Sequence, residues 1–235
     1  MYLHHLETQH FDELTQGSKI DVQLAQLNFI SLQSSAAYDY LLISDRIPRT
    51  NIGMVQNKWL QTYFHVAKGG WWCSGLDPVN KWQVMEWGCF KPNQPRYNKK
   101  GKLIKYEHPP FTPTRVFCFR ITLFIFQKIV QRYNLKLPKN IEFSLDGGIL
   151  GFWQWVVETN IPIIICEGLF DAIAIKRNAV PLLGKNIQSE LMKKIVSSFV
   201  NKIYHHSLIL LYNLQNLDRP QLIHHLQIHL KEHYA

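Results

Sequence analysis

The sequence predicts an α/β protein in which an aromatic-rich α+β region precedes a mostly parallel sheet flanked by helices. Two observations support this prediction. From residue 151 onward, short apolar runs alternate with amphipathic segments, as strands do when helices connect them. Residues 59–90 hold five of the seven tryptophans between turn residues, which indicates antiparallel strands. We therefore expect N-terminal helices and a loop in 1–58, a basic β-rich region in 59–140 and the α/β region in 141–235.

The N-terminal region has helical patterning. Residues 4–33 predict two short helices, which are separated at Gly17 because the following Ser18 can cap the second one. Residues 34–44 predict a third short helix. Pro48 and Gly53 then indicate a loop.

The aromatic region predicts short strands with turns at residues 69–70 and 77–78. Its tryptophans fit either a hydrophobic core or a stacking platform for nucleic-acid bases. A Pro-rich basic connection follows, and residues 99–102 predict a hairpin tip from which residues 103–106 return as a strand.

The C-terminal half begins with a predicted strand at 116–121, an amphipathic helix at 124–137 and a tight turn at 146–148. The expected α/β elements are then a helix at 151–160, a buried strand at 161–168, a helix at 169–178, a strand at 179–184, a helix at 187–199, a strand at 203–212 and a helix at 220–234.

The net charge of +9 is unevenly distributed. Residues 1–50 hold three basic and six acidic side chains, whereas residues 91–140 hold twelve basic side chains and one acid, Glu107. Such a basic region favours a polyanionic partner, most simply nucleic acid, although a solvated basic loop would have the same composition.

The remaining composition bears on the compartment. No apolar run reaches the roughly 18 residues that a membrane span needs, and the first residues lack the pattern of a signal peptide. The four cysteines are widely spaced, and Cys118 and Cys166 lie in apolar runs. We expect a cytoplasmic protein with buried thiols and no membrane partner.

Residues 161–185 contain the strongest chemical signal. Glu167 follows an apolar strand at its carboxyl end, which is where sites form in open α/β sheets. Gly168 allows the backbone to turn there, and Asp171 falls in the first turn of the next helix. The pattern fits an acid/base or metal site, and it also fits a purely structural turn.

The longer string of strand, Glu-Gly, helix with Asp, small-residue strand and "LLGK" resembles the Toprim fold of primases, topoisomerases and related nucleases. The resemblance implies that Glu167 is a general acid/base or a Mg²⁺ ligand. Family members add an Asp-x-Asp pair after the next strand, but Asn213 and Gln215 occupy those positions here. Amides bind Mg²⁺ weakly, so we expect an incomplete metal site in which Asp218 is the nearest second carboxylate.

Several upstream strings extend the resemblance: "GGWWCSGLDP", "MEWGCFKP", "IKYEHPP" and "GFWQWVVETNIPIIICEG". They resemble an N-terminal Toprim-like domain of unknown function found in cyanobacterial plasmid replication proteins of the replication protein A type, over about residues 4–200. Longer members continue into a helicase-like ATPase, and this sequence has no GxxxxGK[ST] nucleotide-binding loop. The resemblance implies replication of a plasmid or mobile element, with DNA and a helicase-like replication protein as partners.

These observations lead to one leading hypothesis, a primase-type, nucleic-acid-handling domain with Glu167 in the site and Asp171 supporting it. The phosphate backbone of DNA, single- or double-stranded, would contact basic side chains: Lys99, Lys100, Lys102, Lys105, Arg115 and Lys185. One alternative is a non-catalytic DNA-binding or partner-docking module. Another is a Toprim-type nuclease, which requires Asp218 to reach Glu167.

Two histidine groups offer weaker alternatives. The first has i, i+4 spacing on one helical stripe and fits either a metal pair or a partly exposed helix edge: His225, His229 and His233. The second could gather around zinc but matches no familiar zinc spacing: His65, Cys73, Cys89 and His108.

Overall fold

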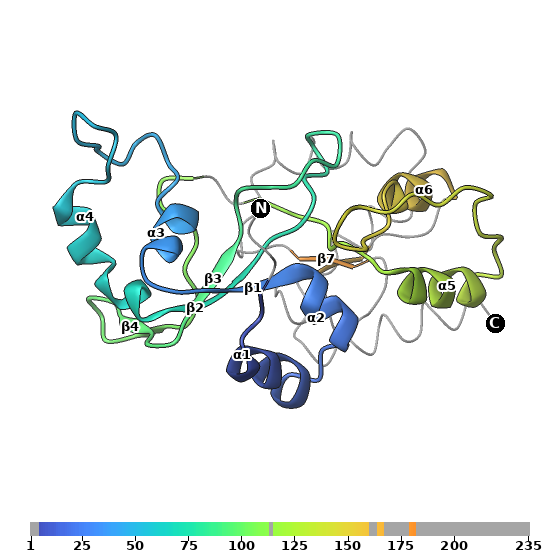
Figure 1. The fold of residues 1–235 in the computed structure, drawn as a ribbon, viewed down its shortest axis with the longest axis horizontal. Helices are drawn as coiled ribbons and strands as arrows, with labels where there is room; N and C mark the ends of the chain where they lie inside the picture. Colours follow the sequence, from blue (N-terminus) through green and yellow to red (C-terminus); the bar gives the residue numbers. More distant parts are fainter. Residues whose placement is uncertain (1–4, 113–114, 160–163, 167–178, 182–235) are drawn as a thin grey trace.

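The computed structural model describes residues 5–112, 115–159, 164–166 and 179–181, which form a mixed α/β protein (Figure 1). The helical elements are α1 (Thr8–Asp12), the π-helical turn η1 (Glu13–Gly17), α2 (Val22–Asn28), α3 (Ser35–Leu41), α4 (Asn57–Thr62), the 3-10 helix η2 (Phe64–Lys68), α5 (Leu123–Arg132) and α6 (Phe152–Glu158). The strands are β1 (Phe29–Leu32), β2 (Gly70–Cys73), β3 (Cys89–Pro92), β4 (Arg96–Tyr97), β5 (Leu103–Ile104), β6 (Ile164–Cys166) and β7 (Ala179–Pro181).

The strands in the described part of the chain form three small sheets. β1, β2 and β3 pair in that order, with both pairs antiparallel. β4 and β5 form an antiparallel hairpin, and β6 pairs with β7 in parallel. The three-stranded sheet lies in the middle of the molecule, between α3 and α4 at one end and α5 and α6 at the other (Figure 1).

This central sheet separates two hydrophobic clusters. Neighbouring side chains on a strand point to opposite faces, so Trp71 and Trp72 enter different clusters. Trp71 packs edge-on against Phe29, with ring centroids 5.3 Å apart. Trp72 packs edge-on against Tyr40 of α3, with centroids 5.5 Å apart. Both indoles are almost fully buried. The two hydrophobic clusters therefore pack on opposite faces of the same strand, β2.

Helix caps fix the elements that cover the sheet. The side chain of Asp21 accepts hydrogen bonds from the main-chain N–H groups of Gln23 and Leu24 and starts α2. Thr122 caps α5 in the same way through the N–H of Ile125. α5 then buries one apolar face in the Trp71 cluster: Ile125, Phe126, Ile129 and Val130.

Several predicted elements are confirmed. α3 and α6 occur where helices are expected, the 99–102 tip joins β4 to β5, and Gly147 adopts a φ of 85° in the predicted tight turn. Of the two interpretations of the tryptophans, the core interpretation is confirmed for Trp71, Trp72 and Trp87, which are all buried.

Three predicted elements are wrong. Residues 29–32 form β1 rather than the end of a helix, because their main chain pairs with β2 and Phe29 and Leu32 are buried. Residues 59–62, which are expected in the β-rich region, belong to α4, so Trp59 lies on a helix. Residues 116–121 form isolated bridges at Val116 and Cys118, the latter with Leu76, in place of a strand.

The predicted fold class is confirmed only in its coarser form, a mixed α/β protein. The three-stranded sheet and the hairpin are antiparallel, and among the described residues parallel pairing is limited to β6 and β7. The expected helices at 169–178, 187–199 and 220–234 and the strand at 203–212 lie outside the described residues. Within the described ranges, no helix is both long and apolar enough to cross a membrane.

The close approach of β2 and β3 yields a test of this packing. A Cβ atom added to Gly70 would overlap the main-chain oxygen of Lys91 and lie 2.9 Å from Cα of Pro92. We expect Gly70→Ala to lower the free energy of unfolding by about 2–3 kcal/mol, as overpacking does. Urea denaturation would measure the loss. Gly17→Ala is the matched control, because no atom lies within 4 Å of its added Cβ, and it should be neutral or slightly stabilising.

Candidate nucleic-acid interface

The β4–β5 hairpin and the residue after it carry four exposed lysines, and one side chain organises the tip of the hairpin. Oδ1 of Asn98 accepts hydrogen bonds from the N–H groups of Lys100 and Lys102, each 2.9 Å long. The main chain closes the same turn, because Asn98 N–H donates to the Lys102 carbonyl and Gly101 N–H donates to the Asn98 carbonyl. Gly101 has a φ of 73°, which favours glycine at this position. The tip is therefore ordered by its own local hydrogen bonds.

The lysines of this hairpin are exposed and have no acidic partner among the described residues. They are Lys99, Lys100, Lys102 and Lys105, which we call the hairpin lysines. Four of the twelve basic side chains in residues 91–140 do pair with an acid within 4 Å: Lys91, Arg96, Arg115 and Arg120. The hairpin lysines are thus half of the eight that the described acids leave unneutralised.

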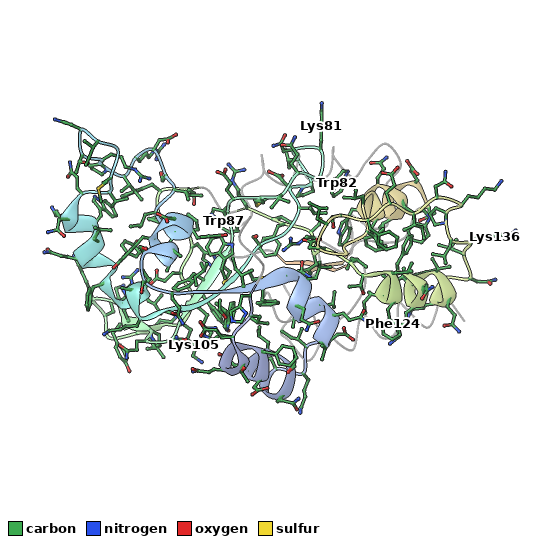
Figure 2. The ribbon with its side chains drawn as sticks, viewed as in Figure 1. Lys81, Trp82, Trp87, Lys105, Phe124 and Lys136 are labelled. Carbon is green, nitrogen blue, oxygen red and sulfur yellow. The ribbon has the colours of Figure 1, made fainter. Side chains whose placement is uncertain are left out.

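The other half lies elsewhere. Lys128, Arg132, Lys136 and Lys139 are exposed on α5 and the segment after it, and we call them the α5 cations. β4 and α5 lie toward opposite ends of the molecule (Figure 1), and Figure 2 places Lys105 and Lys136 correspondingly far apart. The basic region of the sequence is therefore two separate surfaces in the structure, not one patch.

Glu107, the single acid of the basic region, is turned into the protein. Its carboxylate is 5% exposed and accepts hydrogen bonds from Nε of Arg96 at 2.5 Å and Nη2 of Arg96 at 3.0 Å. Nε2 of His65 donates to the same carboxylate at 3.0 Å. The Arg96 guanidinium also lies 5.5 Å from the centre of the Tyr63 ring. The Glu107 carboxylate therefore neutralises the charge of Arg96 and does not pair with the hairpin lysines.

Burial and hydrogen bonding act in opposite directions on Glu107. Burial raises the pKa of its carboxyl group, whereas the hydrogen bonds and charges of His65 and Arg96 lower it. The second set of effects is the larger, so the pKa lies below its ordinary value and the carboxylate is ionised near neutral pH.

The main chain of Glu107 also fixes the hairpin to the central sheet. Its N–H donates to the carbonyl of Phe90, and the N–H of Phe90 donates to the carbonyl of Glu107. Because β3 leads into the hairpin and Glu107 returns from it, both ends of the hairpin are held at one point of the core.

Arg115, which the sequence assigned to the same interface, has a different environment. Its guanidinium lies 3.7 Å from Oδ2 of Asp77. The other carboxylate oxygen of Asp77 accepts a hydrogen bond from Val79 N–H. Lys81, in the same turn as Asp77, lies apart from Lys105 (Figure 2). The structure thus gives Arg115 a partner outside the hairpin.

The predicted catalytic and metal residues belong to the C-terminal part of the sequence. Glu167, Asp171, Lys185 and Asp218 all lie outside the described residues, as do the three C-terminal histidines. β6 does end at Cys166, the residue before Glu167, and it pairs in parallel with β7.

The zinc hypothesis fails on geometry. Nδ1 of His108 donates to the Gly88 carbonyl, His65 binds Glu107, and Cys73 and Cys89 pair across strands within the Trp71 cluster. Burial raises the pKa of both thiols. Among the described residues, no group of three or more His, Cys, Asp or Glu side chains could hold a metal ion.

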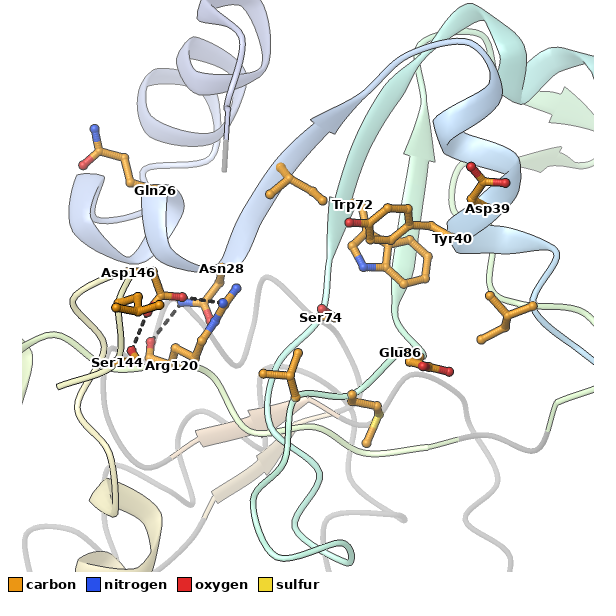
Figure 3. A pocket seen from close by; sticks show the side chains of 15 residues that line it. Gln26, Asn28, Asp39, Tyr40, Trp72, Ser74, Glu86, Arg120, Ser144 and Asp146 are labelled. Carbon is orange, nitrogen blue, oxygen red and sulfur yellow. Dashed lines mark hydrogen bonds and ion pairs between the residues drawn. The ribbon is translucent and has the colours of Figure 1, made fainter. Parts of the chain in front are cut away.

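A second feature, which the sequence did not indicate, is a cavity of about 1020 Å³ lined by α2, α3 and the 144–146 turn (Figure 3). Arg120 crosses its polar end, and Nη1 of Arg120 donates to Asp146 at 2.7 Å. Asn28 holds the main chain of Arg120 by two hydrogen bonds of 2.8 and 3.0 Å. Asp39 and Glu86 also line the cavity, so it offers no surplus positive charge to a phosphate.

The comparisons with known proteins give one relative and no activity. The chain is 38% identical over 168 residues to an uncharacterized protein of Picosynechococcus sp.. That match covers 70% of this chain but only 16% of the relative, so the chain spans about a sixth of the longer protein. No family model matches the chain. No solved structure matches it either.

The Glu107 cluster predicts a pH-dependent contribution to stability. We expect Glu107→Gln to lower the free energy of unfolding near neutral pH by about 2 kcal/mol, less than the ~3–5 kcal/mol of a fully buried pair because Arg96 is one-third exposed. The pKa of Glu107 is depressed in the folded protein, so its contribution is complete above the ordinary value of 4.5 and is lost as pH falls through the folded pKa.

Urea denaturation of both proteins near neutral pH and at about pH 3 would measure this loss. The difference between them should shrink in acid. Glu142→Gln is the matched control, since Glu142 is exposed, and it should change little at either pH. A difference for Glu107→Gln that is equal at both pH values would contradict the assignment.

Proposed function

We propose that this chain is a DNA-binding domain of a plasmid or mobile-element replication protein, and that the β4–β5 hairpin contacts the phosphate backbone. The observation that supports this most directly is the separation of charge around Glu107. The only acid of the region is buried against Arg96 and His65, while the hairpin lysines are exposed without an acidic partner among the described residues. A surface of that kind attracts a nucleic acid regardless of its base sequence.

The hydrogen bonding of the hairpin supports the same proposal. Its tip is organised by Asn98 and its base is anchored by the pairing of Glu107 with Phe90, so its lysines project from an ordered support. Backbone contacts of this type position a protein on nucleic acid and do not read sequence. We therefore expect affinity that depends strongly on salt and weakly on base sequence.

We further propose that the C-terminal part has a Toprim-like fold whose metal site is incomplete. Two observations support the fold: β6 and β7 pair in parallel, and Glu167 is the next residue in sequence after β6. In open α/β sheets, sites form after the carboxyl ends of the strands. The replacement of the expected aspartates by Asn213 and Gln215 supports the incomplete site. On this proposal the domain handles DNA without nucleotidyl transfer of its own, and a separate helicase-like protein would act with it.

The hairpin assignment is tested by charge removal at two matched surfaces. One variant changes all four hairpin lysines to glutamine, and the control changes all four α5 cations to glutamine, so that net charge falls equally. Fluorescence anisotropy with labelled DNA at several salt concentrations measures affinity. The logarithm of the association constant falls as the logarithm of the salt concentration rises. We expect this dependence to become shallower by about 3 in the hairpin variant, because phosphate contacts are lost, and to change less in the control. Equal effects of the two variants would rule out the hairpin as the contact surface.

The metal assignment is tested by calorimetric titration of Mg²⁺ into the wild type and Glu167→Ala. We expect no binding at about millimolar Mg²⁺ in either protein, because one carboxylate with neutral amides offsets little of the ion's charge. Binding to the wild type that disappears in Glu167→Ala would contradict the incomplete site and would support a catalytic Toprim centre instead.

A further inference from the structure

The hairpin end of the molecule also exposes aromatic rings. Tyr97 of β4 is 68% exposed, Phe64 of η2 is 61% exposed and Phe111, just beyond the hairpin, is 52% exposed. Large aromatic side chains are usually buried in a core, as Trp71, Trp72 and Trp87 of this chain are, so three exposed rings at the hairpin end need an explanation.

Strand register places one of these rings beside the charged tip. Tyr97 pairs with Leu103 across the hairpin, and neighbouring side chains on a strand point to opposite faces. Arg96 points inward to Glu107, so Tyr97 points outward. The next residue, Asn98, already begins the turn that presents Lys100 and Lys102. An exposed ring therefore lies next to the exposed lysines.

Contacts beneath the hairpin connect the other two rings to the same site. Phe64 lies between Tyr63, which contacts Arg96, and His65, which binds Glu107. Phe111 packs edge-on against Trp59 at 5.3 Å, and Trp59 stacks on Tyr63 at 6.2 Å. Phe64 is thus adjacent in sequence to two residues that contact the base of the hairpin, and Phe111 is connected to the same base through Trp59 and Tyr63.

Phe64 has a cation of its own. Nζ of Lys68 lies 5.7 Å from the centre of the Phe64 ring, within the range of a cation–π contact. Both side chains are exposed and belong to η2. An aromatic ring with an adjacent ammonium group matches the two parts of a nucleotide, because a base can stack on the ring while the phosphate approaches the lysine.

We propose that this surface binds single-stranded rather than double-stranded nucleic acid, with unpaired bases stacked on Tyr97 and Phe64 and phosphates on the hairpin lysines. The inference rests on the proposed DNA-binding function and specifies its substrate. Bases in a duplex are stacked on each other and offer no free face to a protein ring, whereas unpaired bases stack on aromatic side chains regardless of sequence. Lysines alone would accept either form, so the exposed rings account for the selectivity.

The test compares a labelled single-stranded oligonucleotide with the duplex of the same sequence, using the full chain. In the double variant Tyr97→Ala, Phe64→Ala, we expect the affinity for the single strand to fall about tenfold or more, and the affinity for the duplex to change by less than about twofold. Phe124→Ala is the matched control, since Phe124 is 44% exposed with Lys128 over its ring at 4.0 Å but lies on α5, at the other end (Figure 2). It should leave both affinities unchanged.

A conservative variant separates stacking from local disorder. Tyr97→Phe retains the ring and should retain single-strand binding, whereas loss in Tyr97→Phe as large as in Tyr97→Ala would overturn the stacking role. Equal loss for single strand and duplex in the alanine variants would likewise overturn the inference. If the alanine variants bind normally while the hairpin lysine variant loses both forms of DNA, the substrate assignment fails and the proposed function stands. If the lysine variant also binds normally, the proposed function itself fails.

Discussion

The alternation of side chains along β2 is the constraint on which the described structure depends. Trp71 and Trp72 are adjacent in sequence, and the pleat sends one into each hydrophobic cluster. The helices on either side of the sheet therefore pack on two faces of a single short strand. A shift of the register by one residue would exchange the two indoles and place each against the wrong helices, so the sheet and both clusters form together.

The hairpin extends from this sheet in a way that separates its structural charges from its surface charges. Glu107 occupies the position next to Phe90, where the core is already fixed, and it brings Arg96 and His65 to the base of the hairpin. The hairpin lysines, which lie between Arg96 and Glu107 in sequence, are exposed to solvent. Residues 96–107, which look basic throughout in sequence apart from Glu107, are thus divided by burial: one arginine is committed to packing and four lysines are exposed.

Local sequence patterns predicted the elements whose determinants are local. The turn around Gly101, the helix α6 and the turn around Gly147 follow from glycine placement and apolar spacing within a few residues. β1 and α4 were mispredicted because tertiary pairing and packing, not propensity, decide those segments. The same holds for the candidate site. The composition of the sequence was enough to predict that the hairpin lysines belong to it. The burial of Glu107 and the ion pair of Arg115 with Asp77 could not be predicted, because they depend on contacts between residues distant in sequence.

The arrangement at Asn98 has a consequence for the kinetics of binding. Because one side chain already satisfies the N–H groups of Lys100 and Lys102, the tip is ordered before any partner arrives. Little backbone entropy then remains to be lost on contact, and only the lysine side chains must become ordered. A pre-formed cationic tip acts mainly during diffusional approach, where long-range attraction accelerates encounter. The hairpin would thus set how quickly a polyanion is captured, while slower dissociation would depend on the rings beside it.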